Sequence, residues 1–226
     1  MFRLLHRLHR HATLVCTTLV MVPGLSHAAP TLLDFDHLSG VDYMPGTLVS
    51  APSRLADQFL ASHGVRFSSG AGYAALVHLG LNHATSGMIG VGTTTADGRL
   101  SYSGELRVSF FDVAGGSAGV TDFVGWTTDR LGDGRSVTLA AYGVDGQLLA
   151  QQSWADKGDT QILLAVPGMH SVVFTGSGSA ALDDLQFNAV TRPLSPVPEP
   201  GSAALLVTGL ATLAAAMRRR GARRSV

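Results

Sequence analysis

The sequence of 226 residues predicts an all-β fold, an antiparallel β-sandwich of the jelly-roll type. Short runs of β-branched and aromatic residues recur between turn signals, and no long helical periodicity competes with them. Asp-Gly pairs at 97–98, 133–134 and 145–146 indicate tight hairpin turns, because Asp and Gly tolerate a positive φ.

Each expected strand is a short apolar or alternating run. The run over 105–112 is the clearest, because Leu106, Val108 and Phe110 alternate with polar residues, as in a strand with one buried face. The segment over 141–149 is the clearest hairpin. One short helix is expected over 53–61, with Ser53 as its N-cap. The expected strands cover 31–36, 65–68, 75–79, 88–91, 105–112, 123–126, 136–142, 147–152, 161–165, 171–175 and 181–188.

Residues 1–28 have the pattern of a secretory signal peptide. The first eleven residues contain arginines and no acid, an apolar stretch follows over 12–25, and Ser26-His27-Ala28 offers small residues for signal peptidase. A transmembrane helix is disfavoured because the apolar run is short. A lipoprotein anchor at Cys16 is disfavoured because that cysteine lies inside the apolar run. Cys16 is the single cysteine, so the exported chain would depend on its core or a metal rather than on disulfides.

The C-terminal segment has three parts with different physical roles. Residues 191–200 are rich in proline, which keeps the chain extended and outside a sheet. Residues 201–217 form an uncharged apolar run that is long enough for a short transmembrane helix. The basic tail over 218–226 begins with Arg218-Arg219-Arg220, which would hold this end in the cytoplasm.

This arrangement resembles the PEP-CTERM sorting signal of Gram-negative bacteria. The carrying residues are Val197-Pro198-Glu199-Pro200, the apolar run after them, and Arg218, Arg219 and Arg220. The resemblance implies export through the inner membrane, recognition and cleavage near the box by an exosortase, and delivery to the cell surface or extracellular matrix. The helix over 201–217 would then be a sorting helix that holds the chain in the membrane before cleavage.

Residues 29–190 are expected to form the exported domain. The order of its blocks over 33–36, 55–68, 107–112, 142–149 and 181–187 is similar to that of the β-sandwich ectodomains found ahead of PEP-CTERM signals. Those ectodomains in turn resemble galactose-binding-like jelly rolls and carbohydrate-binding modules. The resemblance implies a role in binding sugar.

The charge of the exported part differs from the whole-chain value of zero. Of 16 basic residues, three lie in the signal peptide and five in the tail, which leaves 8 against 16 acidic residues, a net charge of about −8. Nucleic acid is therefore not an expected partner, because few cations remain to neutralise phosphates.

Four aspartates are candidates for a structural Ca²⁺ site: Asp34, Asp36, Asp183 and Asp184. The first and last strands of a jelly roll commonly lie side by side, which would bring these carboxylates together as hard-cation ligands. In a regular strand Asp183 and Asp184 would point to opposite faces, so at most one would face inward. The alternative is that these acids flank turns or sit at solvated strand ends.

Trp154 and Trp126 are the candidate ligand-contacting residues, because sugar binding uses aromatic faces beside polar groups. Trp154 lies in a polar context at the end of an expected strand, and Trp126 precedes a polar segment. The alternative is that both rings pack in the core.

The sequence carries no convincing catalytic constellation. The segment Gly115-Gly116-Ser117-Ala118-Gly119 fits the nucleophile-elbow pattern, but that motif needs a following helix on a parallel sheet, and a strand-like run follows instead. His63, His78 and His83 could bind Zn²⁺, but separate surface histidines fit the pattern better.

We therefore predict a non-catalytic surface or matrix protein that binds matrix polysaccharide or has a structural role. The alternative is an extracellular hydrolase that acts on polysaccharide through paired aspartates.

Overall fold

The computed structural model describes residues 29–79, 86–114, 116–128, 136–155, 160–176 and 181–193. The predicted signal peptide, Val197–Pro200 box, sorting helix and basic tail lie outside the described residues, as does the predicted turn at 133–134. Within the described ranges, no helix is long and apolar enough to cross a membrane.

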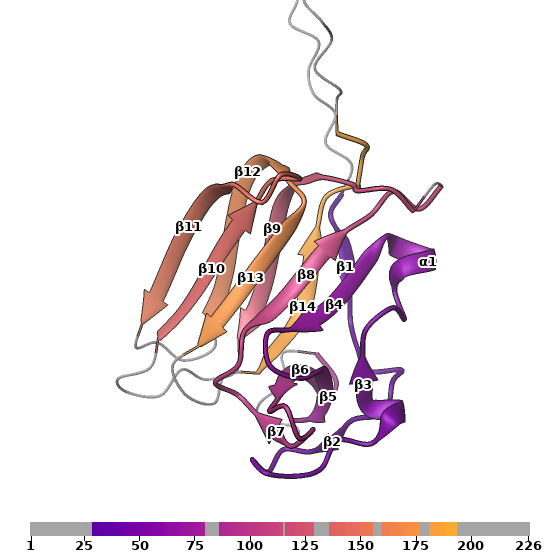
Figure 1. Ribbon diagram of the computed structural model, residues 1–226, viewed down its shortest axis with the longest axis vertical. Helices are drawn as coiled ribbons and strands as arrows, with labels where there is room; N and C mark the ends of the chain where they lie inside the picture. Colours follow the sequence, from indigo (N-terminus) through magenta and orange to yellow (C-terminus); the bar gives the residue numbers. More distant parts are fainter. Residues whose placement is uncertain are drawn as a thin grey trace, which may run out of the picture.

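Two β-sheets pack face to face as a sandwich, which confirms the predicted fold class (Figure 1). The smaller sheet has the order β11-β10-β13-β8-β4, and the larger has the path β12-β9-β14-β6-β5-β2, with β1 on β14, β3 on β5 and β7 on β6. Pairing is antiparallel except between β2 and β5. The strands of the smaller sheet are β4 (Val65–Ser69), β8 (Leu106–Phe110), β10 (Ser136–Tyr142), β11 (Leu148–Ala155) and β13 (Ser171–Gly176). Those of the larger sheet are β1 (Thr31–Leu33), β2 (Val41–Asp42), β3 (Arg54–Leu55), β5 (Ala74–His78), β6 (Ile89–Thr94), β7 (Leu100–Ser101), β9 (Thr121–Thr128), β12 (Thr160–Met169) and β14 (Leu182–Phe187).

The first and last strands lie side by side, as predicted. Leu33 of β1 pairs with Leu185 of β14, and the pairing runs antiparallel to Thr31 and Phe187. This pairing places the first strand of the domain beside its last strand within the larger sheet.

The main core fills the space between the sheets. On β8, Leu106, Val108 and Phe110 are buried while Arg107 and Ser109 stay half-exposed, so the predicted alternation is confirmed. Phe67 lies between two other rings, with ring centroids 5.9 Å from Phe35 and 6.3 Å from Trp126.

A second, smaller core covers the outer face of the larger sheet. Ala75 and Val77 of β5 point away from the main core and pack beneath Val49, Leu100 and Tyr102. The neighbouring strand leaves little room beneath this core, because a Cβ on Gly92 would lie 3.1 Å from the Tyr102 ring. The strands β2, β3 and β7, which were not predicted, are two-residue strands of the larger sheet that pair with β5 or β6.

The predicted helix over 53–61 is wrong. The chain there forms a 3-10 turn, η1 (Ala51–Ser53), then β3, and then a one-turn helix, α1 (Leu60–His63), that Ser53 does not cap. Leu55 pairs with Ala74 of β5 and is buried, so the sheet competes successfully with the local helical pattern.

Both predicted turns inside the described ranges are confirmed. Gly146 has φ +78° and donates its N–H to the carbonyl of Gly143 at 3.0 Å, while Gly98 has φ +80° and donates to Thr95 at 2.9 Å. Each turn therefore uses the Asp-Gly pair because glycine accepts the left-handed backbone at low cost.

Replacing Phe67 by alanine tests the main core. We expect the variant to lose about 3–5 kcal/mol of unfolding free energy, because the ring is fully buried between other rings. Urea unfolding at fixed temperature measures the loss. Leu148→Ala, on an exposed side chain of β11, is the control and should change stability little; equal losses in both variants would contradict the assigned core.

Candidate functional site

A hollow of about 850 Å³ lies at one end of the sandwich. We call it the end cavity. Its wall is formed by the start of β9, the β10–β11 hairpin, the irregular part of β12 and the residues that follow β14. The residues that matter for its chemistry are Asp122, Val144, Asp145, Gln147, Pro167 and Arg192.

The hairpin side of the end cavity is a tight turn. Gly143 donates its N–H to the carbonyl of Gln147 at 3.0 Å, and Gly146 donates to Gly143 at the same distance. These two bonds put Val144 and Asp145 at the exposed tip. The Asp145-Gly146 turn therefore places the carboxylate of Asp145 on the cavity wall.

The β12 side is shaped by a break in strand pairing. The register of β12 against β9 shifts between Ala165 and Met169, and Gly168 within that stretch has φ +84°. Pro167 lies in the same stretch and cannot donate a ladder hydrogen bond. The irregular stretch therefore presents Pro167 and Gly168 to the cavity.

The polar groups of the wall are held by neighbours. Asn188 donates from Nδ2 to Oδ1 of Asp122 at 2.8 Å, which fixes that carboxylate at the start of β9. Arg192 donates from Nε to Oδ2 of Asp112 at 2.5 Å. The hydrogen bond from Arg192 is the largest of the effects that lower the pKa of Asp112, so Asp112 stays charged and compensates the guanidinium.

Apolar side chains complete the wall. Val120, Val144, Leu149 and Pro167 line it beside the carboxylates and Gln147. A concave site of this size, mostly apolar with a few placed polar groups, is typical of small-ligand recognition.

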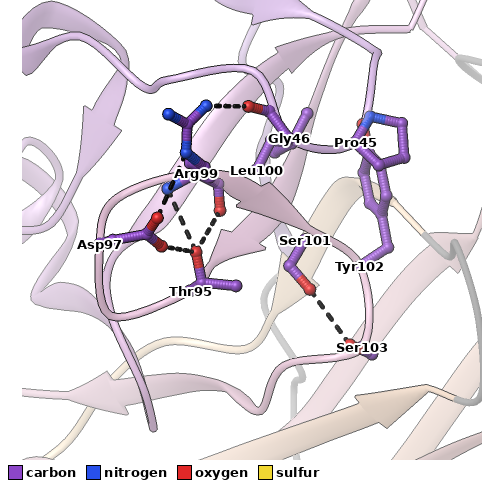
Figure 2. A pocket seen from close by; sticks show the side chains of 9 residues that line it. All are labelled: Pro45, Gly46, Thr95, Asp97, Arg99, Leu100, Ser101, Tyr102 and Ser103. Carbon is purple, nitrogen blue, oxygen red and sulfur yellow. Dashed lines mark hydrogen bonds and ion pairs between the residues drawn. The ribbon is translucent and has the colours of Figure 1, made fainter.

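A second hollow of about 470 Å³ lies where the β6–β7 turn meets the segment at Pro45 and Gly46 (Figure 2). Its polar groups bond to one another: Arg99 donates from Nη1 to the carbonyl of Gly46 at 2.9 Å and contacts Asp97 at 3.2 Å, and Thr95 donates to Asp97. The Thr95 hydroxyl is the main cause of the lowered pKa of Asp97. These bonds fasten the turn to the neighbouring segment, so they explain the polar residues without a ligand.

Three of the four predicted metal ligands gather at one segment, residues 86–89. Oδ1 of Asp36 accepts the N–H groups of Met88 at 2.8 Å and Ile89 at 3.1 Å. A Cβ at position 87 would lie 2.0 Å from the Asp36 carboxylate, so Gly87 is required there.

Asp183 and Asp184 reach the same segment from β14. Asp183 is buried and its Oδ2 accepts the N–H of Ser86 at 2.9 Å, while Oδ1 of Asp184 accepts the Ser86 hydroxyl at 2.7 Å. Asp183 is buried whereas Asp184 is only half-buried, and Asp184 has φ +53° where the register of β14 against β9 shifts, so the strand is not regular here.

Asp34 makes a different contact: it lies 3.6 Å from Nδ1 of His37. Among the described residues, no group of three or more His, Cys, Asp or Glu side chains is placed to hold a metal ion. The carboxylates of Asp36, Asp183 and Asp184 accept hydrogen bonds from N–H and hydroxyl groups of residues 86–89. Structural Ca²⁺ stays a prediction, which chelation tests below.

The two tryptophans differ in place. Trp126 is 1% exposed inside the main core, so its ring has no face to offer a ligand and the alternative of core packing holds. Trp154 is half-buried on the edge strand β11, opposite Val137, and packs against the main core. Neither residue lines the end cavity.

The structure excludes a nucleophile elbow at Ser117. Ala118 bridges Phe111, the carbonyl of Ser117 accepts the N–H of Asp112 at 2.9 Å, and strand β9 follows rather than a helix. The segment is thus a turn between β8 and β9. His63 bonds to Ser62 at 2.8 Å and His78 is exposed, while His83 lies outside the described residues.

Sequence reasoning missed the end cavity, because its wall comes from four separate stretches of chain. The one local signal was the Asp145-Gly146 turn, which predicts an exposed carboxylate at a hairpin tip. Nothing in the local pattern around Asp122, Asn188 or Arg192 indicates that they meet.

No family model matches the chain, and no curated protein matches it. Among solved structures, TmCBM61 in complex with β-1,4-galactotriose is 13% identical, covers 62% of this chain and 99% of its own, and has a TM-score of 0.31. A DUF4465 family protein from Bacteroides caccae is 13% identical, covers 73% and 95%, and scores 0.35. A carbohydrate-binding module of Cellvibrio mixtus lichenase 5A in complex with cellotriose is 13% identical, covers 63% and 98%, and scores 0.29. The fold assignment itself rests on the strand pairing described above.

Asp36→Ala tests the contact between the chain after β1 and the segment over 86–89. We expect a loss of about 1–2 kcal/mol of unfolding free energy, because two backbone N–H groups lose a charged acceptor. Asp36→Asn should lose less, because its side-chain oxygen still accepts a hydrogen bond. Thermal and urea unfolding measure both changes.

Asp34→Ala is the matched control, since Asp34 is exposed and should contribute little. The same samples test the predicted Ca²⁺: a chelator should lower the melting temperature of the wild type but not of Asp36→Ala. An unchanged wild-type melting curve would contradict a stabilising Ca²⁺ site.

Proposed function

We propose that this protein is a non-catalytic, exported component of the cell surface or extracellular matrix that binds polysaccharide in the end cavity. One observation carries the proposal: a hollow of about 850 Å³ in which carboxylate and amide groups stand beside an apolar wall. That volume lies within the range of small-ligand sites, which is about 300–1,000 Å³.

The wall suits the two chemical sides of a sugar ring. The hydroxyl groups at the ring edge both donate and accept, so they can pair with the carboxylates of Asp122 and Asp145 and with the amide of Gln147. The C–H faces of the ring are apolar and can contact Val144, Leu149 and Pro167. The cavity is also open at the end of the sandwich, which leaves room for a longer chain to continue.

The surroundings of the two carboxylates favour binding over hydrolysis. A glycosidase needs one carboxylic acid in a water-poor setting that keeps its proton. Asp122 and Asp145 are both exposed, so neither stands in a water-poor setting. Extracellular hydrolysis of polysaccharide remains the alternative function.

Gln147→Ala tests the proposed site. The full chain, purified in a detergent without a sugar headgroup, is titrated with polysaccharide from the producing organism's own matrix. We expect saturable binding by the wild type and about a threefold to tenfold weaker Kd for Gln147→Ala, because one hydrogen bond to the sugar is lost.

Gln151→Ala is the matched control, because Gln151 is an exposed glutamine on β11 outside the cavity. Absence of wild-type binding, or equal weakening by both variants, would overturn the proposed site. Release of reducing ends during the titration would favour the hydrolase instead.

We further propose that signal peptidase and an exosortase process the chain on its way to the surface. The support is the sequence pattern of residues 1–28 and the resemblance of Val197–Pro200 and the segments after it to a sorting signal. Replacing Val197–Pro200 by alanines should leave the uncleaved chain in the inner membrane, as measured by fractionation and immunoblotting. If the alanine variant reached the surface as well as the wild type does, the exosortase step would be contradicted.

A further inference from the structure

Two neighbouring edge strands of the sandwich carry no charged side chain. Strand β11 ends the order of the smaller sheet at the outer edge of the molecule, β12 ends that of the larger sheet, and the two strands lie close together (Figure 1). β11 has eight residues and β12 has ten, and none of them is Asp, Glu, Lys or Arg. The exported part carries a net charge of about −8, which repels a second copy, and an uncharged side reduces that repulsion.

The other sheet edges are covered, short or interrupted. Strand β4, at the far edge of the smaller sheet, is covered by the chain before it: Phe67 and Val65 donate their N–H groups to the carbonyls of Ala56 and Phe59 at 2.9 and 3.3 Å. Strand β2, at the far edge of the larger sheet, has two residues. Strand β12 contains Pro167, where its register against β9 shifts. Among the described strands, β11 is therefore the long edge strand without these protections.

The regular part of β11 starts at Ala150, from which every residue pairs in register with β10. Ala150, Gln152 and Trp154 lie opposite buried residues of β10 and face the inner side of the sheet, while Gln151 and Ser153 face the outer side. Gln152 is exposed although it faces inward, because it lies on the edge. A strand added at this edge would therefore meet side chains on both faces as well as the free backbone groups.

These side chains complement their own copies in one antiparallel register. A two-fold axis at Gln152 places Trp154 opposite Ala150 and Gln151 opposite Ser153, so apolar meets apolar on one face and polar meets polar on the other. Gln152 meets Gln152 of the second copy, and the two amides can hydrogen-bond to each other. Moving the axis by one residue in either direction would instead set Gln152 against Ala150 or Trp154.

We propose that the domain forms a two-fold dimer in which β11 pairs antiparallel with β11 of a second copy, with the axis at Gln152. The two five-stranded sheets then join into one continuous sheet, and the half-buried Trp154 is covered further by the second copy. Because both copies use the same edge and the opposite edge of that sheet is covered, the assembly closes at two copies. This dimer goes beyond the proposed function and does not depend on a sugar in the end cavity.

Single cysteines test the register of this pairing. Cys16 is the only cysteine of the chain and is first replaced by serine. The full chain with Gln152→Cys is then oxidised mildly in detergent, and the disulfide-linked dimer is measured on a non-reducing gel. We expect about fivefold more dimer than for Ser153→Cys, because directly opposed residues are close enough for a disulfide, whereas Ser153 lies opposite Gln151 rather than its own copy.

Ser68→Cys is the control for chance collision and for association through the C-terminal segment. Ser68 is equally exposed, but it lies on β4, at the opposite edge of the same sheet. If Ser68→Cys or Ser153→Cys formed as much dimer as Gln152→Cys, the inferred pairing would be overturned.

Sedimentation velocity gives a second readout that needs no disulfide. We expect the wild-type chain to form a dimer as its concentration rises, and Gln152→Glu to weaken that association about tenfold, because two carboxylates would lie directly opposite each other. Ser68→Glu adds the same charge at the covered edge and should weaken association much less. A wild-type chain that stays monomeric, or equal weakening by the two variants, would overturn the dimer and leave the glycan titration of Gln147→Ala unaffected.

Discussion

The pairing of β14 with three other strands is the interaction on which the rest of the structure depends. Leu182, at its start, pairs with both β6 and β9, and its second half pairs with β9 and β1. Leu182, Leu185 and Phe187 are buried in the main core. The pairing of β14 with β1 therefore joins the first strand of the domain to its last. The buried side chains of β14 also form part of the core against which the smaller sheet packs.

Strand β14 positions residues of two regions, the segment over 86–89 that contacts aspartates and the end cavity. At its start, Asp183 and Asp184 hold Ser86, and Asp36 from the chain after β1 holds the next residues of the same segment. Just past its end, Asn188 holds Asp122. Carboxylates at one end thus meet backbone N–H groups and have a structural role, whereas Asp122 and Asp145 at the other end stand on an open wall. The same residue type takes two roles because its surroundings differ.

Sequence reasoning worked where the deciding forces act within a few residues and failed where distant pairing decides. The alternation of β8 and the turns at 97–98 and 145–146 are local, and the structure confirms them. The segment over 53–61 has apolar residues at helical spacing, but Leu55 pairs with Ala74 of β5 instead. Strands as short as β2, β3 and β7 carry no periodic signal, because two residues cannot show a period.

The amino-acid sequence by itself determined the fold class, most strand positions and the pairing of the first strand with the last, because hydrophobic alternation and first-to-last strand pairing are general properties of such sandwiches. Only the tertiary structure decided that Trp126 packs in the core and that Ser86 and its neighbours receive the acids. It also decided that Asp122, Asp145 and Arg192 surround one cavity. The physical reason is that these contacts join residues far apart in the chain, and strand register, which no local pattern specifies, brings them together.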